Sequence, residues 1–190
     1  MSALKLKLSR GDPLQTDFLA TGNKVLYTSE TITYPRALHG SRATTAVTRR
    51  DAVGGPLPVG VIEWPANPHD RPRLVIGTRF VEMKKTGLYA SPEKFQAQDG
   101  RTYEWQASNF PVQLVPLHAG HNAAYVATFL QSSQGFFKVW NRGSSASLLV
   151  APGGLHMLDD IVVTFIYFES QWRDRERHKA RIGCLPTLAT

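Results

Sequence analysis

The chain has very little cysteine, and this scarcity excludes two classes of small protein. Cys184 is the single cysteine among 190 residues, so neither an intrachain disulfide nor a zinc site built from several thiolates can form. A disulfide-stapled secreted fold is therefore excluded, and a reducing intracellular compartment is the simpler expectation. Because no histidine partner for Cys184 is identifiable, we expect an inert thiol.

The sequence also lacks long apolar runs. The longest, residues 161–168, is far shorter than the ~20 residues that a helix needs to cross a bilayer. The N-terminal segment MSALKLKLSR alternates leucine with lysine and offers no continuous apolar stretch of the kind found in secretory signals. We therefore expect a soluble cytoplasmic protein with no signal peptide and no transmembrane segment.

Acidic residues are outnumbered by basic ones. Asp and Glu total 15 against 22 Lys and Arg, which gives a net charge of +7. Such a surplus favours anionic partners, namely membrane lipid headgroups, acidic proteins or nucleic acid, although it also serves solubility alone. Its densest block lies near the C-terminus, at Arg173, Arg175, Arg177, Lys179 and Arg181. No other block is dense enough to indicate a nucleic-acid groove, so nucleic acid stays open as a partner without a named site.

Signatures of the large enzyme classes are missing as well. The sequence contains no serine nucleophile elbow, phosphate-binding loop, dinucleotide fingerprint or series of zinc ligands. His118 and His121 are the only close histidine pair, and they would hold a divalent metal only if a carboxylate joined them. Asp159 or Asp160 would orient the imidazole of His156 as a general base. Helix capping, however, explains both aspartates without catalysis. We expect no cofactor and favour a non-enzyme, with a metal-assisted nuclease or phosphoesterase at His118 and His121 as the alternative.

Short strand patterns make up most of the chain. Residues 4–8 alternate leucine with lysine, as a half-buried strand does. Asp99-Gly100 readily adopts the positive φ angles of a two-residue hairpin turn, so residues 94–98 and 101–105 are predicted to pair. Further strands are expected at residues 25–32, 43–48, 59–64, 74–81, 112–117, 125–130, 136–140 and 147–151. About ten short strands separated by turns predict a sandwich or a barrel.

One segment near the C-terminus predicts a helix. Asp159 and Asp160 open residues 155–179 and basic residues close them, which matches the helix macrodipole. The apolar residues between them cover every side, as a helix surrounded by protein requires. A buried strand is the competing interpretation, because the segment is rich in Val, Ile, Thr and Tyr. We favour a helix over about residues 157–178 inside a single domain of residues 1–181, followed by a tail of residues 182–190.

Two segments resemble a known family. Phe95 to Trp105 read Phe-x-Ala-x-Asp-Gly-Arg-x-Tyr-x-Trp, and Met157 to Thr164 read Met-Leu-Asp-Asp-Ile-Val-Val-Thr before an aromatic run. This pattern is similar to the domain-of-unknown-function family 6593 of mushroom-forming fungi. That family is itself similar to the tubby C-terminal superfamily, which includes the phospholipid scramblases and the LURP-one-related proteins. The resemblance implies a closed antiparallel barrel of about twelve strands that encloses a hydrophobic C-terminal helix.

The resemblance and the charge together imply binding rather than catalysis. Tubby domains bind phosphoinositides through surface Lys and Arg, but neither their headgroup motif nor a scramblase-type metal segment is recognisable in this sequence. We expect an intracellular binding module that engages anionic phospholipid headgroups or an acidic partner, and a cytoplasmic fungal defence lectin is a further alternative. The candidate anion-binding residues are Arg71, Arg73, Lys84, Lys85, Arg173, Arg175 and Arg177.

Overall fold

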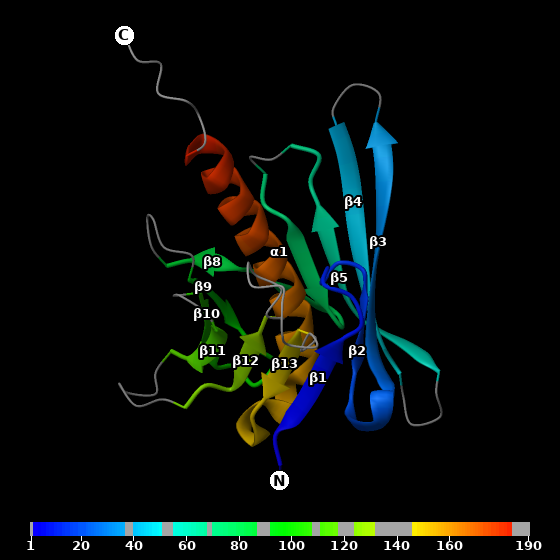
Figure 1. The fold of residues 1–190 in the computed structure, drawn as a ribbon, viewed down its shortest axis with the longest axis vertical. Helices are drawn as coiled ribbons and strands as arrows, with labels where there is room; N and C mark the ends of the chain where they lie inside the picture. Colours follow the sequence, from blue (N-terminus) through cyan, green and yellow to red (C-terminus); the bar gives the residue numbers. More distant parts are fainter. Residues whose placement is uncertain are drawn as a thin grey trace, which may run out of the picture.

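A long helix and a strongly curved antiparallel sheet make up the fold (Figure 1). The computed structural model describes residues 2–36, 40–50, 55–67, 70–86, 92–107, 111–117, 124–131 and 146–183. The strands of these residues are β1 (Leu4–Leu8), β2 (Thr16–Leu19), β3 (Val25–Arg36), β4 (Gly40–Arg50), β5 (Pro56–Trp64), β6 (Arg73–Ile76), β7 (Arg79–Val81), β8 (Lys84–Lys85), β9 (Glu93–Gln96), β10 (Thr102–Gln106), β11 (Val112–Pro116), β12 (Ala127–Leu130) and β13 (Ser147–Val150). Short 3₁₀ helices occupy Thr21–Asn23 and Pro152–Met157, and the helix α1 spans Leu158–Gly183.

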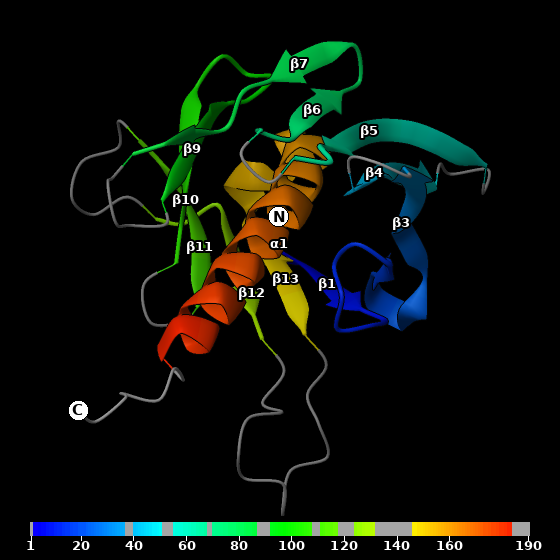
Figure 2. The same ribbon diagram turned by 90° about the horizontal axis from the view of Figure 1, so that it is seen from above.

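In the part of the chain that the structure describes, the sheet surrounds α1 without closing on itself. Its thirteen strands follow the order β7-β6-β5-β4-β3-β2-β1-β13-β12-β11-β10-β9-β8. Viewed from above, these strands curve around the helix (Figure 2). The expected closed barrel of about twelve strands is therefore corrected to an open sheet of thirteen strands with β7 and β8 at its ends.

The two ends of the sheet are neighbours in the sequence. Glu82 and Met83 alone separate β7 from β8. In β7, Val81 pairs with Leu74 of β6, whereas in β8, Lys84 pairs with Lys94 of β9. Residues 79–85 thus run as one extended segment that changes its partner halfway, and this segment is called the switch segment below. The change of partner is the reason that the ladder remains open.

Most of the expected strands are present in the described residues. The hairpin around Asp99-Gly100 is present, but its turn is one residue longer than the predicted two: Ala97 N donates to Arg101 O at 2.9 Å, so residues 98–100 form the loop, and Gly100 has a φ of 79° whereas Asp99 has no positive φ. Residues 74–81, expected as one strand, form two, because the chain turns at Gly77 with a φ of 58°. The strand expected at residues 136–140 lies outside the described residues.

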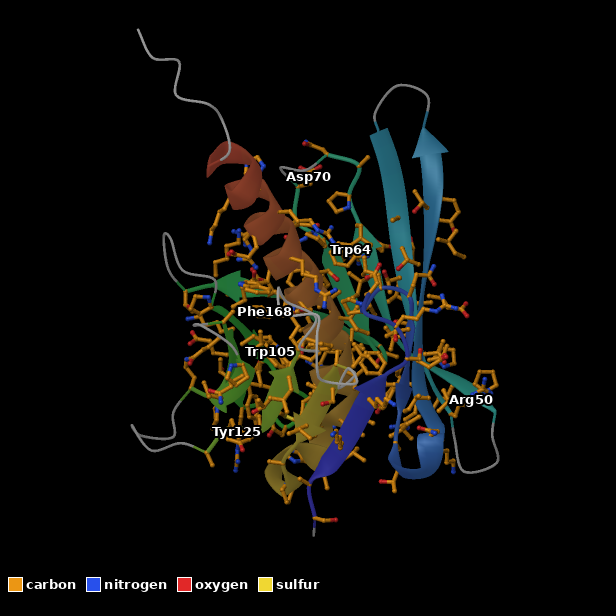
Figure 3. All side chains as sticks on the ribbon, in the orientation of Figure 1. Arg50, Trp64, Asp70, Trp105, Tyr125 and Phe168 are labelled. Carbon is orange, nitrogen blue, oxygen red and sulfur yellow. The ribbon has the colours of Figure 1, made fainter. Side chains whose placement is uncertain are left out.

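The helix prediction is confirmed and the competing buried strand is wrong, but α1 ends at Gly183 instead of near residue 178, so it includes the first two residues of the expected tail. Every residue from Asp160 to Ser170 is buried. Phe165 lies at the centre of this core, with ring centroids 4.7 Å from Phe129 and 6.2 Å from Phe18. Trp105 packs against Phe168 and donates its indole N–H to Thr164 Oγ1 at 3.0 Å (Figure 3). The apolar residues on all sides of α1 are therefore explained by a sheet that contacts them from all sides.

The two aspartates at the start of α1 attach it to different parts of the sheet: Asp159 to β3 and β4, and Asp160 to β7 at one end of the sheet and to the β9–β10 turn near the other end. Asp159 accepts hydrogen bonds from the Tyr27 hydroxyl on β3 and from Arg49 Nη1 on β4, the latter at 3.0 Å. Asp160 accepts one from Arg79 on β7 and one from Gln98 N at 2.8 Å. The sequence predicted these residues as helix caps, but the hydrogen-bond partners described for their carboxylates lie on the sheet and in the β9–β10 turn, so they position the helix within the sheet.

Gly60 on β5 lies close against α1. A Cβ atom at this position would lie 2.6 Å from Val163 Cγ2 and 3.2 Å from Val75 O. We expect Gly60→Ala to lower the free energy of unfolding by about 1–3 kcal/mol, because the packed helix cannot move away freely. Urea denaturation measures this, with Gly11→Ala as the control since a Cβ there would meet nothing within 4 Å. Equal stability of the two variants would contradict this close packing.

Candidate functional site

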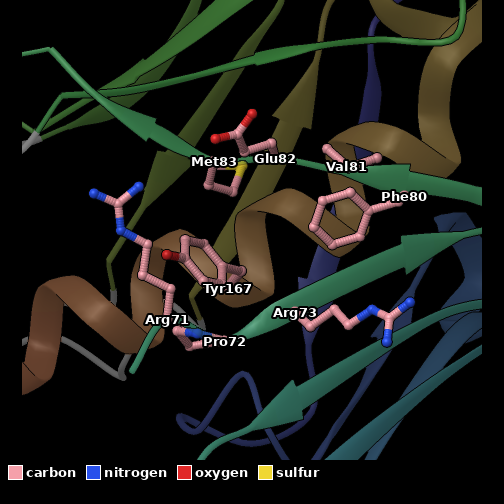
Figure 4. Close-up of a pocket in the computed structure, with 8 residues that line it drawn as sticks. All are labelled: Arg71, Pro72, Arg73, Phe80, Val81, Glu82, Met83 and Tyr167. Atoms are coloured by element: carbon pink, nitrogen blue, oxygen red, sulfur yellow. The ribbon is translucent and has the colours of Figure 1, made fainter. Parts of the chain in front are cut away.

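A hollow of about 480 Å³ opens beside the switch segment (Figure 4). Its walls come from residues 71–73, which lead into β6, and from residues 80–83, while α1 supplies the floor through Tyr167. The hollow lies where the β6–β7 ladder has ended and the β8–β9 ladder has not begun. Its volume falls within the ~300–1,000 Å³ typical of small-molecule sites. The lining residues are Arg71, Pro72, Arg73, Phe80, Val81, Glu82, Met83 and Tyr167.

The inner surface of the hollow is apolar. Val81, Met83 and Tyr167 are all buried, with exposed fractions of 3%, 6% and 5%. The Tyr167 ring also stacks on Trp64 at a centroid distance of 6.0 Å and an interplanar angle of 8°. Burial, and next the negative charge of Glu93, raise the pKa of Tyr167 well above its ordinary value, so this phenol stays neutral.

The rim of the hollow is cationic. Arg71 and Arg73 are exposed, and neither forms an ion pair with any carboxylate in the described part of the chain. The Arg71 guanidinium extends beside Tyr167, whereas Arg73 points the other way (Figure 4), with its Cζ 5.6 Å from the Phe80 ring centroid. Glu82 is the one acidic lining residue, and its carboxylate lies 3.0 Å from Lys84 Nζ. The hollow therefore combines an apolar floor with two arginines that have no carboxylate partner.

Arg71 and Arg73 also line a second, shallower hollow of about 410 Å³. This one lies on the side of the loop that follows β5 and includes Trp64 and Asp70. Its other cation, Arg42, pairs with Glu63 at 3.4 Å.

A third hollow of about 680 Å³ lies on the opposite side of the switch segment, toward β9. Arg79 crosses this gap by donating to Gln96 O at 2.9 Å and by pairing with Asp160 of α1. Burial raises the pKa of Asp160, while the Gln98 amide and the charge of Arg79 oppose this rise. The Arg79 side chain therefore connects β7 to β9 where no backbone hydrogen bonds join these two strands in the described structure. Because it also pairs with Asp160, Arg79 is not available to an external anion.

The seven candidate anion-binding residues do not gather in one place. Arg71 and Arg73 share a hollow. Lys84 lines the third hollow, and Lys85 is exposed on β8 without lining any of the three. Arg177 lies on the exposed part of α1, 3.3 Å from Asp174. The structure thus brings together one pair of the seven.

Arg173 and Arg175 are each bound to a buried carboxylate, one on α1 itself and one on β9. Arg173 Nε donates to Glu169 Oε1 at 2.8 Å, and its Nη1 donates to Gly11 O. Arg175 Nη2 donates to Glu93 Oε1 on β9 at 2.7 Å. Removal of either arginine would leave a buried carboxylate without its partner. Arg175 joins α1 to β9, whereas Arg173 pairs within α1 and reaches the chain between β1 and β2 only through Gly11 O.

The metal-site alternative rests on residues that the structure does not describe. His118 and His121 lie outside the described residues. Within the described ranges, no three His, Cys, Asp or Glu side chains come close enough to form a metal site. His156 Nε2 lies 3.0 Å from Asp99 Oδ2, so its carboxylate neighbour is in the β9–β10 turn. No described helix is long and apolar enough to cross a membrane.

Sequence reasoning missed the apolar half of the hollow. The sequence pattern identified Tyr167 only as a residue with strand propensity, and it indicated no role for Met83 or Phe80. One signal was available, because Tyr167 places a polar group within the apolar run of residues 161–168, and a buried tyrosine usually needs a polar neighbour. Nothing in the sequence indicated that the ladder breaks at Glu82 and Met83.

Comparison with known proteins places the chain in a family without assigning a function. A family model described as "Family of unknown function (DUF6593)" matches residues 11–174. This range includes both segments that carry the resemblance described from the sequence. No curated protein matches the chain, and no solved structure does.

Proposed function

The chain belongs to the DUF6593 family, and we propose that this member is a non-enzymatic binding module for an anionic phospholipid headgroup. One observation carries the proposal: Arg71 and Arg73 lie exposed, without a carboxylate partner among the described residues, at the mouth of a preformed hollow. Arginine is suited to phosphate because its planar fork of N–H donors matches the phosphate oxygens and keeps its charge.

The concave shape favours a headgroup over an acidic protein surface. An acidic protein would call for a broad basic patch, yet Arg173 and Arg175 pair with buried carboxylates and Lys84 pairs with Glu82. The net charge of +7 would still draw the molecule toward an anionic membrane before the specific contact forms.

A distant relation to the tubby C-terminal superfamily, within a fungal family, is part of the same proposal. It is supported by the apolar helix enclosed in an antiparallel sheet. Proteins that share an architecture often differ in function. The headgroup proposal therefore depends on the two arginines and not on the fold. A cytoplasmic location is proposed on the basis of the single cysteine.

Co-sedimentation with vesicles tests the headgroup proposal. We expect the protein to sediment with phosphatidylcholine vesicles only when these contain a phosphatidylinositol phosphate. Substituting both Arg71 and Arg73 with alanine should weaken this binding roughly thirtyfold, at about 1 kcal/mol for each arginine near the surface. The matched control substitutes Arg10 and Lys24, which are exposed cations elsewhere, and removes the same charge. Equal sedimentation with neutral vesicles, or equal losses in both double variants, would refute the proposal.

A further inference from the structure

The change of partner in the switch segment leaves two stretches of backbone facing each other without pairing. If the β6–β7 register continued past Leu74 and Val81, Arg73 would face Glu82 and Pro72 would face Met83. Neither pair forms in the described structure, because the segment has already turned toward β9, where Lys84 pairs with Lys94. The hollow is therefore a split in the sheet whose floor is the Tyr167 ring.

The walls of this split suit a hydrocarbon better than a peptide strand. A peptide added to the sheet needs a row of backbone donors and acceptors on the strand that it joins. Pro72 lies in the middle of one wall, and proline has no N–H to donate. The facing wall carries the buried side chains of Val81 and Met83, and methionine adapts readily to the shape of an apolar ligand.

The apolar split and the cationic rim lie side by side, so one molecule can meet both. Phe80 stands at the mouth with 57% of its surface exposed, and it is the largest apolar side chain between the solvent and the floor. Arg71 and Arg73 flank the split from the wall that contains Pro72. A headgroup held at this rim therefore leaves its attached chain next to the apolar lining formed by Val81, Met83 and Tyr167.

We infer that the split binds an acyl chain, so that the ligand is an anionic lipid held by its headgroup on Arg71 and Arg73 and by its hydrocarbon over Val81, Met83 and Tyr167. This inference rests on the proposed function and adds the part of the ligand that lies beyond the headgroup. Burial of hydrocarbon supplies binding free energy in proportion to the apolar area removed from water. The acyl chain, rather than the phosphate alone, would then account for most of the affinity.

Isothermal titration with soluble ligands tests the inference. We expect a short-chain lysophosphatidic acid, kept below its micelle concentration, to bind at least roughly tenfold more tightly than glycerol 3-phosphate, and longer chains to bind more tightly still. Met83→Trp should fill the split and remove this advantage. The chain-length series on the unmodified protein tests the inference even where Met83→Trp fails to fold. Arg10→Ala, which alters a distant exposed cation, should retain the full advantage.

The outcomes separate this inference from the proposed function. Equal affinities for lysophosphatidic acid and glycerol 3-phosphate would overturn the acyl-chain site while the headgroup proposal stood. Equal affinities for lysophosphatidic acid and lysophosphatidylcholine would show that the protein does not select an anionic headgroup, which would refute both the proposed function and this inference. If vesicles containing anionic lipid bind and the soluble single-chain lipid does not, the protein recognises only the membrane surface and the inference fails.

Discussion

Phe165→Asp is expected to abolish soluble folding. Phe165 is fully buried on α1, and its ring lies among those of Phe18, Trp105 and Phe129. Loss of a buried phenylalanine costs about 3–5 kcal/mol, and a buried carboxylate without a partner costs several more. A domain is stable by only about 5–15 kcal/mol in total. The two losses together are therefore comparable with the whole stability of a domain, and the same result is expected for Ile161→Asp.

Soluble expression followed by thermal unfolding, monitored by circular dichroism, measures the effect of Phe165→Asp. Phe80→Asp is the matched control, because it is the same substitution at a residue that is 57% exposed and faces Arg73. It should remain soluble and melt within a few degrees of the unmodified protein, as exposed substitutions usually do. A soluble Phe165→Asp protein with a cooperative transition would contradict the central position of α1.

The helix could be predicted from the sequence because its requirement is local. Residues 161–168 are apolar on every side of a helix, and only a surrounding structure can bury them all. The hairpin at Asp99-Gly100 was equally local, because the turn residues and the two arms are contiguous. In both cases the information lies within a single stretch of chain, so no knowledge of distant partners was needed.

The open ends of the sheet could not be predicted in the same way. Whether a barrel closes depends on whether β7 and β9 meet in register, and this depends on backbone geometry at Glu82 and Met83. The turn at Gly77, which divides the strand expected at residues 74–81, could not be predicted either. A glycine within a strand pattern is compatible with a bulge, a turn or an uninterrupted strand.

The candidate site was half predicted for a related reason. The exposed pair Arg71 and Arg73 could be identified by charge alone. Arg173 and Arg175 have the same charge, yet their partners Glu169 and Glu93 are buried, and Glu93 lies on a distant strand. A dense basic cluster therefore did not indicate a binding surface, because the fold supplied buried carboxylates that the local sequence does not show.

Arg79→Ala is expected to cost about 3–5 kcal/mol of stability at neutral pH, because it leaves a buried carboxylate without its partner. Asp160 has 1% of its side chain exposed and cannot reach solvent, whereas Arg79 is 35% exposed. The opposite change, Asp160→Asn, should cost less, because Arg79 can turn to water and the Asn carbonyl can still accept the Gln98 N–H. The two substitutions in this ion pair are thus predicted to lower the free energy of unfolding by unequal amounts.

Acidification should partly rescue Arg79→Ala. Burial already raises the pKa of Asp160, and the positive charge of Arg79 is one of the effects that oppose this rise. Without Arg79 the folded-state pKa rises further above the unfolded value of about 3.9. The folded protein then binds a proton more tightly than the unfolded chain does, so its free energy of unfolding increases as the pH falls through the folded pKa. The increase stops below the unfolded pKa, where both states are protonated.

Urea denaturation over a range of pH tests both statements about Arg79. The deficit of Arg79→Ala relative to the unmodified protein should be largest at neutral pH and should shrink toward pH values near ~4. Adding Asp160→Asn to Arg79→Ala should recover most of the neutral-pH deficit and remove its pH dependence. Lys84→Ala is the control, since its partner Glu82 is exposed and such surface pairs contribute about 1 kcal/mol or less. A deficit that stays constant with pH would mean that Asp160 is not the charge that Arg79 compensates.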